Sequence, residues 1–362
     1  MPGALSGLVI ADFSRVLAGP YATMLLGDLE AEVIKVERPG RGDDTRSWGP
    51  PYNQQGESTY FAGLNRNKTS LFLDLSKPDD IAAARVLIGR ADVLVENFTP
   101  GTMDRVGLDY DSAVALNSRL VYCSITGFGS AGGASLPGYD LLVQAMGGLM
   151  SITGPNSDEP TKAGVAFVDV VTGLHAVYGI LAALRHRDLT GLGQHVEVNL
   201  LSSLLSAMVN QSAAYAGAKV IPHSMGNDHP SISPYSVYAT ADQPMVLAVG
   251  NDGQFAKLAI GVGAPEWIDD PRFETNPARV EHREELRREI ESRLKTRNAA
   301  EWVDQLREIG VPCGPINDMA QAFALATELG LQPITAADQV ANPVQFSATP
   351  PSYRLPPPRL HR

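Results

Sequence analysis

Short apolar runs alternate with segments of helical spacing through the first 125 residues, and this alternation limits the chain to few folds. The runs are rich in β-branched residues and show little polar alternation, as strands buried on both faces do. Strands separated by helices build a parallel, doubly wound sheet of the α/β class. The predicted strands are residues 8–11, 32–36, 70–75, 92–95 and 120–125, and the predicted helices are 21–29, 79–90 and 110–117.

The second half of the chain begins with an apolar stretch of helical spacing, residues 139–184. Further on, residues 221–234 are rich in Pro, Ser, Asn and Gly, which is typical of a linker. A smaller lobe is predicted after it, at about 225–325, and the proline-rich tail from residue 343 is predicted to be extended. The other predicted elements are a strand at 194–199, a helix at 200–216, a hairpin at 235–240 and 245–249, and charged helices at 278–295 and 299–309.

Composition narrows the range of partners. The net charge is −11 and no basic helix stands out, so neither nucleic acid nor an anionic membrane is expected to bind. The apolar stretch 165–184 is interrupted by Asp169 and His175, which favours a buried helix over a membrane span. Cys123 and Cys313 lie far apart and the N-terminus lacks a secretion signal, so we expect a cytoplasmic protein. The seven histidines show no metal-binding spacing, and no metal site is expected.

Familiar nucleotide and hydrolase motifs are missing from the sequence. The first strand–helix turn has Gly19 alone where a dinucleotide fingerprint needs three glycines. No GxxxxGK[ST] loop occurs. The nearest approach to the GxSxG elbow of serine hydrolases is at residues 222–226, and it lacks the first glycine. The sheet is therefore not expected to bind a nucleotide through these motifs.

Nine segments, taken together and in order, resemble the class III CoA-transferase family, of the formyl-CoA transferase, carnitine CoA-transferase and α-methylacyl-CoA racemase type. The likeness runs from residue 5 to about residue 350, and so many short motifs in register make it specific. The segments are 12–20 (DFSRVLAGP), 32–37 (EVIKVE), 42–46 (GDDTR), 65–68 (NRNK), 95–98 (VENF), 138–140 (GYD), 190–194 (TGLGQ), 226–230 (GNDHP) and 310–315 (GVPCGP).

The resemblance implies a Rossmann-like large domain with a parallel sheet, built from both ends of the chain, plus a smaller α+β domain. Residues 1–224 would form the first part of the large CoA-binding domain, 225–325 the small domain, and 326–362 a segment that returns to the large domain. Two subunits would interlock as a homodimer. The substrates would be an acyl-CoA and a small carboxylate, with no tightly bound cofactor because the coenzyme A thioester is itself a substrate.

The resemblance identifies Asp169 as the catalytic nucleophile, because it matches the family aspartate that opens the long apolar helix. Its position alone predicts a helix N-cap instead, and the two roles are compatible since a helix N-terminus stabilises an anion. The implied chemistry is covalent catalysis through mixed anhydrides and an aspartyl-CoA thioester. A backbone N–H near Ala18 is expected to stabilise the developing oxyanion.

The resemblance also implies which residues hold coenzyme A. Arg38 and Arg105 suit phosphate groups by charge and geometry, although each also fits a solvated surface arginine. The resemblance places Tyr139 beside the thioester, whereas a lone aromatic is more often core, and His175 is expected to be a core histidine. The implied CoA-binding set is Leu17, Ala18, Arg38, Leu73, Asp74, Leu75, Ser76, Asn97, Phe98, Thr99, Arg105, Pro137, Gly138, Tyr139 and Asp140. The implied acyl pocket is Arg15, Val16, Trp48 and Tyr60.

Three functions remain to be separated. The favoured one is an acyl-CoA:carboxylate CoA-transferase that uses a short or dicarboxylic acyl-CoA. The alternative is a 2-methylacyl-CoA racemase or a related acyl-CoA isomerase, but Tyr139 stands where the racemase branch has a histidine base. A tyrosine, with a pKa of about 10, is a poor base at neutral pH. The third is a CoA-binding protein without catalysis, which would be expected to lack the aspartate at position 169.

Overall fold

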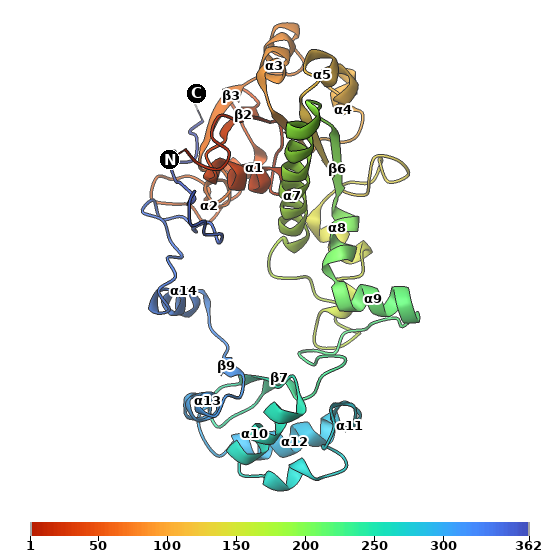
Figure 1. Cartoon of the computed structure of the whole chain (residues 1–362), viewed down its shortest axis with the longest axis vertical. Coiled ribbons are helices and arrows are strands. Elements are labelled where there is room, and N and C mark those ends of the chain that lie inside the picture. The colour runs from red at the N-terminus through yellow and green to blue at the C-terminus, as the bar shows by residue number, and fades with distance from the viewer. Residues whose placement is uncertain (1, 361–362) are drawn as a thin grey trace. The chain divides into compact units, whose positions relative to one another are not determined.

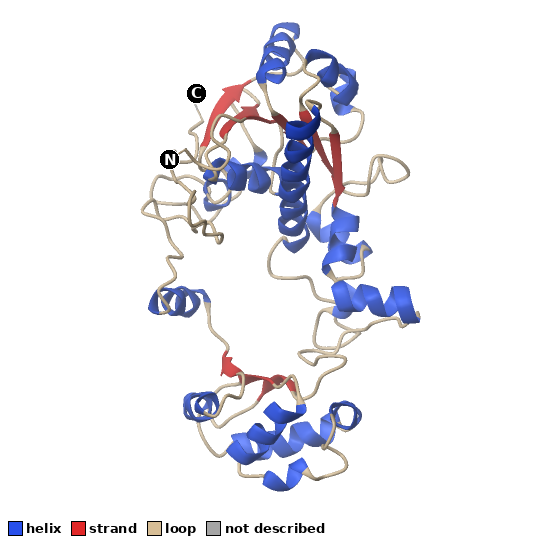
Figure 2. Cartoon of the chain, viewed as in Figure 1, coloured by secondary structure: helices blue, strands red, loops and turns tan. Residues whose placement is uncertain are grey.

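The computed structural model describes residues 2–360, and a six-stranded sheet lies at the centre of its first compact unit. This unit comprises residues 1–150, 162–222 and 331–362. All six strands are parallel, in the order β3-β2-β1-β4-β5-β6. Figure 2 shows strands in red and helices in blue. The predicted α/β fold with a parallel sheet is therefore confirmed. The strands are β1 (Val9–Asp12), β2 (Glu32–Glu37), β3 (Lys68–Phe72), β4 (Val93–Glu96), β5 (Val121–Thr126) and β6 (His195–Asn199).

Every strand predicted in this unit forms, but β3 is displaced toward the N-terminus. It begins at Lys68 rather than at Ser70, because Lys68 pairs with Val33 of β2. It ends at Phe72, so residues 73–76 leave the sheet as a loop. The predicted extension of this strand to residue 75 is wrong, and the loop is free to face a ligand beyond the end of the strand.

Both faces of the sheet are covered, which explains the absence of polar alternation in the strands. Along β1, Ile10 points to one face and Ala11 to the other, since successive side chains alternate. Ile10 belongs to the cluster that includes residues of α1 (Ala18–Asp28), α7 (Phe167–Thr190) and α8 (Leu200–Ala207) (Figure 1). Ala11 belongs to the cluster that includes α3 (Pro78–Arg90) and α5 (Tyr110–Leu116).

The strand order reverses between β1 and β4, because the chain first builds outward through β2 and β3 and then returns to the other side of β1. In open parallel sheets, ligands bind at such a switch point, beyond the carboxyl ends of the strands. The fold alone therefore directs attention to the loops that follow Asp12 and Glu96.

The helix α7 is long and apolar enough to cross a membrane by length and composition. One such helix is weak evidence, because a core helix of a soluble protein passes the same test. Val168, Ala176 and Ile180 are fully buried in the core beside the sheet. Leu174 and Tyr178, in contrast, are exposed on this single chain. One side of α7 therefore packs on the sheet, and another presents apolar side chains to the surroundings.

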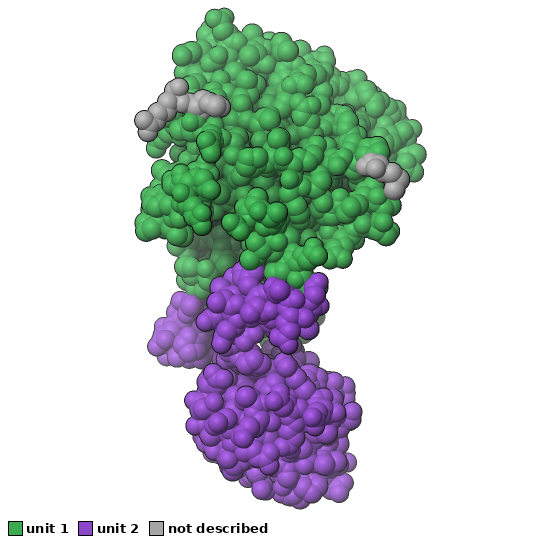
Figure 3. All heavy atoms as spheres, turned by 90° about the vertical axis from the view of Figure 1, so that its left-hand side faces the viewer, with its two compact units in different colours: residues 1–150, 162–222, 331–362 green, residues 151–161, 223–330 purple. Residues whose placement is uncertain are grey.

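The second compact unit comprises residues 151–161 and 223–330 (Figure 3). The predicted hairpin is confirmed, because β7 (Tyr235–Tyr238) pairs antiparallel with β8 (Met245–Ala248), and a short β9 (Cys313–Pro315) adds to β8. Segment 151–161 also groups with this unit, which its sequence did not indicate. The helices of the unit are α10 (Asp252–Gly261), α11 (Asn276–Glu281), α12 (Arg283–Leu294), α13 (Ala299–Glu308) and α14 (Met319–Glu328), with a short 3-10 helix at Pro265–Ile268.

Two helices predicted as continuous are in fact divided. The segment 278–295 is split at His282, whose ring contacts the Ala278 carbonyl at 3.0 Å, into α11 and α12. The segment 200–216 is split at Met208 into α8 and α9 (Val209–Ala218), and the Ser212 hydroxyl donates to the Leu205 carbonyl near the break. Such side-chain bonds compete with the helical ladder. The remaining elements are α2 (Thr59–Ala62), α4 (Thr102–Arg105), α6 (Asp140–Met146) and 3-10 turns at Asp44–Ser47 and Met150–Ile152.

The C-terminal segment is held on the first unit by the turn before β3. Asn67 has a left-handed backbone, with φ of 60°, and its side chain bonds Ser352 and Arg354 at 2.7 Å each. Arg66 donates two bonds to the buried Asp28 carboxylate and a third, of 2.8 Å, to the Val340 carbonyl. The NRNK segment thus has a structural role. It joins the end of the chain to the sheet.

Candidate functional site

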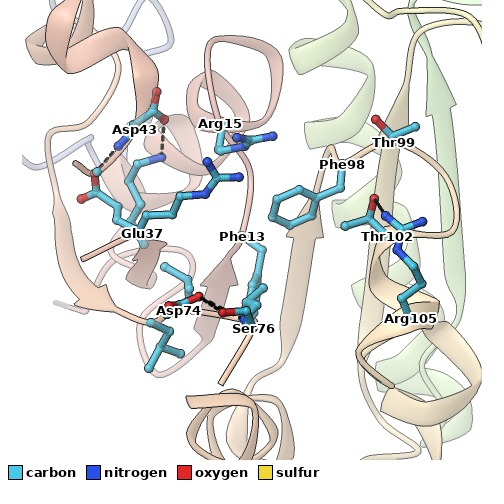
Figure 4. Close-up of a pocket in the computed structure, with 16 residues that line it drawn as sticks. Phe13, Arg15, Glu37, Asp43, Asp74, Ser76, Phe98, Thr99, Thr102 and Arg105 are labelled. Carbon is cyan, nitrogen blue, oxygen red and sulfur yellow. Dashed lines mark hydrogen bonds and ion pairs between the residues drawn. The ribbon is translucent and has the colours of Figure 1, made fainter. Parts of the chain in front are cut away.

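A cavity of about 470 Å³ opens beyond the carboxyl ends of β1 to β4, at the switch point of the sheet (Figure 4). Its wall is built by residues that directly follow these strands, among them Phe13 after β1, Arg38 after β2 and Phe98 after β4. The implied CoA-binding residues that line it are Arg38, Leu73, Asp74, Leu75, Ser76, Phe98, Thr99 and Arg105. Arg15, implied for the acyl pocket, lines the same cavity. The other implied CoA-binding residues, which lie outside its lining, are Leu17, Ala18, Asn97, Pro137, Gly138, Tyr139 and Asp140.

The loop between β1 and α1 is fixed by side chains from β2 and from the loops that follow β2 and β4. Asn97 accepts from the Arg15 N–H at 2.8 Å and donates to the Arg15 carbonyl at 2.7 Å. Lys35 donates to the Ser14 carbonyl at 3.0 Å. Val16 holds a φ of 68°, an outlier for a β-branched residue, with Asp43 3.3 Å from its N–H. The Asn97 amide is thus engaged by this loop, which its implied role in binding CoA did not anticipate.

A buried charge network supports this loop, and sequence patterns gave no sign of it. Lys68 lies 3.0 Å from the Asp12 carboxylate, and Lys35 lies 2.9 Å from Asp43. Burial opposes ionisation of Asp12, but Lys68 and Lys35 outweigh it and lower the pKa of Asp12 to about 2. Burial lowers the pKa of Lys68 to about 8, because Asp12 offsets the lost hydration only in part. Arg46 pairs with the Glu37 carboxylate at 2.7 Å and extends the network to the cavity wall.

Asp169 lies inside the first turn of α7, so the N-cap prediction is wrong. The N-cap position is Ala166, and the capping carboxylate comes instead from Asp140. One Asp140 oxygen accepts from the Val168 N–H at 2.8 Å and from the Asp169 N–H at 3.2 Å. Gln144 donates to the other Asp140 oxygen at 2.6 Å. This frees the Asp169 carboxylate, which forms no hydrogen bond or ion pair with residues 2–360.

Two helix N-termini meet near this free carboxylate. A Cβ on Gly173 would lie only 2.7 Å from the Ala18 carbonyl oxygen, so glycine permits α7 to approach the first turn of α1. Asp169 lies one turn before Gly173 on the same side of α7. Within residues 2–360, no side chain accepts a hydrogen bond from the first N–H groups of α1. Unpaired backbone N–H groups at a helix start favour a nearby anion.

The environment of Asp169 perturbs two titrating groups. Burial raises the pKa of the Asp169 carboxyl to about 7, and the charge of Asp140 adds to the shift. Burial likewise raises the pKa of Tyr60 to about 12, with added effects from Asp169 and Asp140. Tyr60 packs edge-on against Trp48, with ring centroids 5.3 Å apart. The structure thus brings together Asp169, Asp140, Tyr60 and Trp48, whereas the sequence associated the last two only through resemblance.

The position of Asp140 is set by a tight backbone crossing. A Cβ on Gly127 would lie 2.4 Å from the Cα of Gly138, so neither position has room for a side chain.

Tyr139 is 67% exposed on this chain, which excludes the core role that a lone aromatic usually has. His175 lies 3.0 Å from the Ser203 hydroxyl through its Nδ1, as expected for a satisfied structural histidine. Residues 2–360 contain no cluster of potential metal ligands.

Comparisons with known proteins identify the family of this chain. The sequence model of CoA-transferase family III matches residues 5–362. The succinate–glutarate CoA-transferase of Agrobacterium fabrum is 42% identical, over 98% of this chain and 92% of its own. The succinyl-CoA:glutarate CoA-transferase of Mus musculus is also 42% identical, over 98% of this chain and 84% of its own. A CaiB/BaiF family protein from Brucella suis has 40% identity and a TM-score of 0.88, covering 99% of this chain and 97% of that one.

The chain therefore belongs to CoA-transferase family III. It is a CoA-transferase, as the resemblance in its sequence predicted.

Proposed function

We propose that this enzyme moves coenzyme A from a short dicarboxylic acyl-CoA to a second dicarboxylate, with Asp169 as nucleophile. The observation that carries the proposal is the free, half-buried carboxylate of Asp169 at the start of α7, beside the uncapped start of α1. The names of the two relatives described above specify succinate or succinyl-CoA together with glutarate, which supports dicarboxylic substrates.

The proposed reaction has four balanced steps and needs no ATP, proton or electron carrier. The Asp169 carboxylate attacks the donor thioester carbon, the C–S bond breaks, and a mixed anhydride and CoA thiolate form. The thiolate attacks the aspartyl carbon, which gives an aspartyl-CoA thioester and releases the donor acid. The acceptor carboxylate attacks this thioester and expels the thiolate, and the new anhydride is cleaved by the thiolate at the acceptor carbon. Asp169 returns as a carboxylate.

The residues around Asp169 support each step. Asp140 accepts from the N–H groups of Val168 and Asp169, and Gln144 donates to the other Asp140 oxygen, so the Asp169 carboxylate is not consumed by helix capping. A carboxyl with a raised pKa is a stronger nucleophile once ionised, and burial limits the hydrolysis of an anhydride. Backbone N–H groups at Leu17 and Ala18 would stabilise the oxyanion formed on the thioester carbon. Val16, Trp48 and Tyr60 would border the acyl group.

Coenzyme A would occupy the cavity at the strand ends. Arg38 and Arg105 line this cavity and form no ion pair with a carboxylate in the described part of the chain, so both are available for phosphate. The loop of Leu73, Asp74, Leu75 and Ser76 would contact the adenosine portion, and residues 137–140 the pantetheine. Coenzyme A is here a substrate and not a bound cofactor.

The enzyme would work as a homodimer in the cytoplasm. Apolar side chains are exposed on several helices of the single chain, among them Leu174 and Tyr178 of α7 and Val209 of α9. Exposed apolar patches usually mark contacts with another molecule. Sedimentation of the wild type should show a dimer, and Tyr178→Glu should weaken it. Both cysteines are free, as expected of a reducing compartment.

Oxygen-18 labelling tests the mechanism directly. When both carboxyl oxygens of the acceptor acid are labelled, the route moves one of them into the Asp169 side chain, where peptide mass spectrometry detects it. Asp169→Asn should abolish transfer of label into the CoA ester, with coenzyme A binding retained as the control. Transfer that persists in Asp169→Asn would contradict the proposal. Exchange of the α-proton with deuterium, without any acceptor acid, would instead indicate the racemase alternative.

A further inference from the structure

Arg15 lines the cavity at the strand ends, yet its guanidinium lacks a close partner. Its Nε is buried and has no hydrogen-bond partner within residues 2–360. The nearest carboxylate oxygen, on Asp44, is 3.7 Å from Nη1, beyond a good hydrogen bond. The guanidinium lies 5.1 Å from the centre of the Phe98 ring, and Figure 4 shows it between Asp43 and Phe98. A buried unpaired donor is costly, so it indicates a ligand atom at this point.

The backbone around Arg15 is held more firmly than a surface loop requires. Asn97 bonds both the N–H and the carbonyl of Arg15, which fixes the direction of its side chain. The following residue, Val16, is kept at a φ of 68°. Strain of this kind persists only where surrounding contacts enforce it. The loop is therefore built to present Arg15 to the cavity.

An inventory of the charges in the cavity wall shows which groups are available. Lys35 pairs with Asp43, and the Glu37 carboxylate accepts from Arg46. The arginines that remain without a hydrogen-bonded carboxylate within the described residues are Arg15, Arg38 and Arg105. A coenzyme A molecule carries three phosphoryl groups, two in its diphosphate and one on the ribose. Guanidinium forks match phosphate oxygens in geometry as well as in charge.

We propose that Arg15 binds a phosphoryl group of the CoA thioester, and that Asn97 is a positioning residue that holds Arg15 in place. This inference rests on the proposed function, since it assumes that the cavity receives coenzyme A. It differs from the acyl-pocket role that the resemblance implies for Arg15. Asp169 does not belong to the lining of the cavity that Arg15 faces.

Three donors that differ only in phosphate content test the assignment: succinyl-CoA, succinyl-dephospho-CoA and succinyl-pantetheine. Arg15→Gln should raise KM for succinyl-CoA by about 10- to 100-fold, the effect of losing charge-assisted hydrogen bonds. It should leave KM for succinyl-pantetheine unchanged within about twofold. The dephospho donor shows whether the ribose phosphate or the diphosphate is contacted. Arg41→Gln is the matched control, because Arg41 is exposed nearby and lies outside the cavity lining.

A double-mutant cycle tests Asn97. If Asn97 acts through Arg15, Asn97→Ala should raise KM for succinyl-CoA, and the double variant should be no worse than Arg15→Gln alone. Additive losses would reject the positioning role. If Arg15→Gln raised KM for succinyl-pantetheine as much as for succinyl-CoA, the phosphate assignment would be overturned. It would also be overturned if Arg15→Gln raised KM for succinyl-CoA but not for butyryl-CoA, because Arg15 would then bind the acyl carboxylate. For variants without turnover, calorimetry would measure the affinity for coenzyme A in place of KM. Failure of wild-type transfer would reject the proposed function, whereas an unchanged KM in Arg15→Gln would reject this inference alone.

Discussion

Replacing Asp169, the proposed nucleophile, should make the protein more stable, and more so as the pH rises. The Asp169 carboxyl has a pKa of about 7 in the folded protein, against an ordinary value of 3.8. Below pH 4 it is protonated in both states and favours neither. Between these values the unfolded chain releases a proton that the folded chain retains, so the folded state loses stability as the pH rises. Above pH 7 the full penalty is present.

The size of the effect follows from this shift. Raising the pKa of Asp169 from 3.8 to about 7 corresponds to about 4 kcal/mol of free energy. Asp169 is only half-buried, so solvent screening reduces this to about 2 kcal/mol at pH 8. Asp169→Asn keeps the shape of the side chain and removes the charge. It should therefore raise the melting temperature at pH 8 by about 4–8 °C, given the size of the first unit.

Thermal unfolding of the wild type and the variant at pH 5 and pH 8 provides the measurement. The difference in melting temperature should grow between these two values, while CoA transfer is abolished. Asp188→Asn is the control, because it removes an exposed charge from the same helix. Its difference should not grow with pH. If Asp169→Asn did not raise the melting temperature at pH 8, the Asp169 carboxylate would be well solvated. The electrostatic basis of the proposed site would then be lost.

Three further outcomes are expected. In a pH–rate profile, the rate of CoA transfer by the wild type should rise with pH through about 7. Asp140→Asn should move that rise to lower pH, because it keeps a capping oxygen but removes the charge that raises the pKa of Asp169. Arg66→Ala should lower the free energy of unfolding in urea by about 3–5 kcal/mol and expose residues 340–355 to protease. Arg272 is exposed, so Arg272→Ala should lower the same free energy by less than about 1 kcal/mol. Gly173→Ala should separate α1 from α7 and lower kcat, while Gly89→Ala, where a Cβ meets open space, should stabilise by about 0.5–1 kcal/mol.

The parts of the fold that depend on local periodicity could be predicted from the sequence. Short apolar runs, several of them rich in β-branched residues, predicted the strands of the sheet, and helical spacing predicted α3 and α5 to within one residue at each end. The division of longer helices was missed because it depends on single side-chain bonds, such as that of Ser212. The order of the strands was not predicted either, since it is decided by packing between segments far apart in the chain.

The lining of the cavity could be predicted in part, because several of the implied residues follow the ends of strands, whereas contacts between distant segments could not. Arg38 and Arg105 were assigned through resemblance, and both line the cavity. The cap that Asp140 places on α7 joins segments 28 residues apart in sequence, and no local pattern encodes it. The charge network of the buried lysines was also missed, because Lys35 pairs with Asp43 and Lys68 with Asp12 through contacts between separate segments.

The attachment of the C-terminal segment to the NRNK turn has a consequence for synthesis on the ribosome. Asp28 and Arg66 are made early, but the Val340 carbonyl and the backbone of residues 352–355 that complete their surroundings are made among the last. The second unit, residues 151–161 and 223–330, emerges entirely before them. The nascent sheet must therefore wait with an unfinished polar edge while a later unit leaves the exit tunnel. These contacts of the first unit can therefore be completed only after the second unit has been translated.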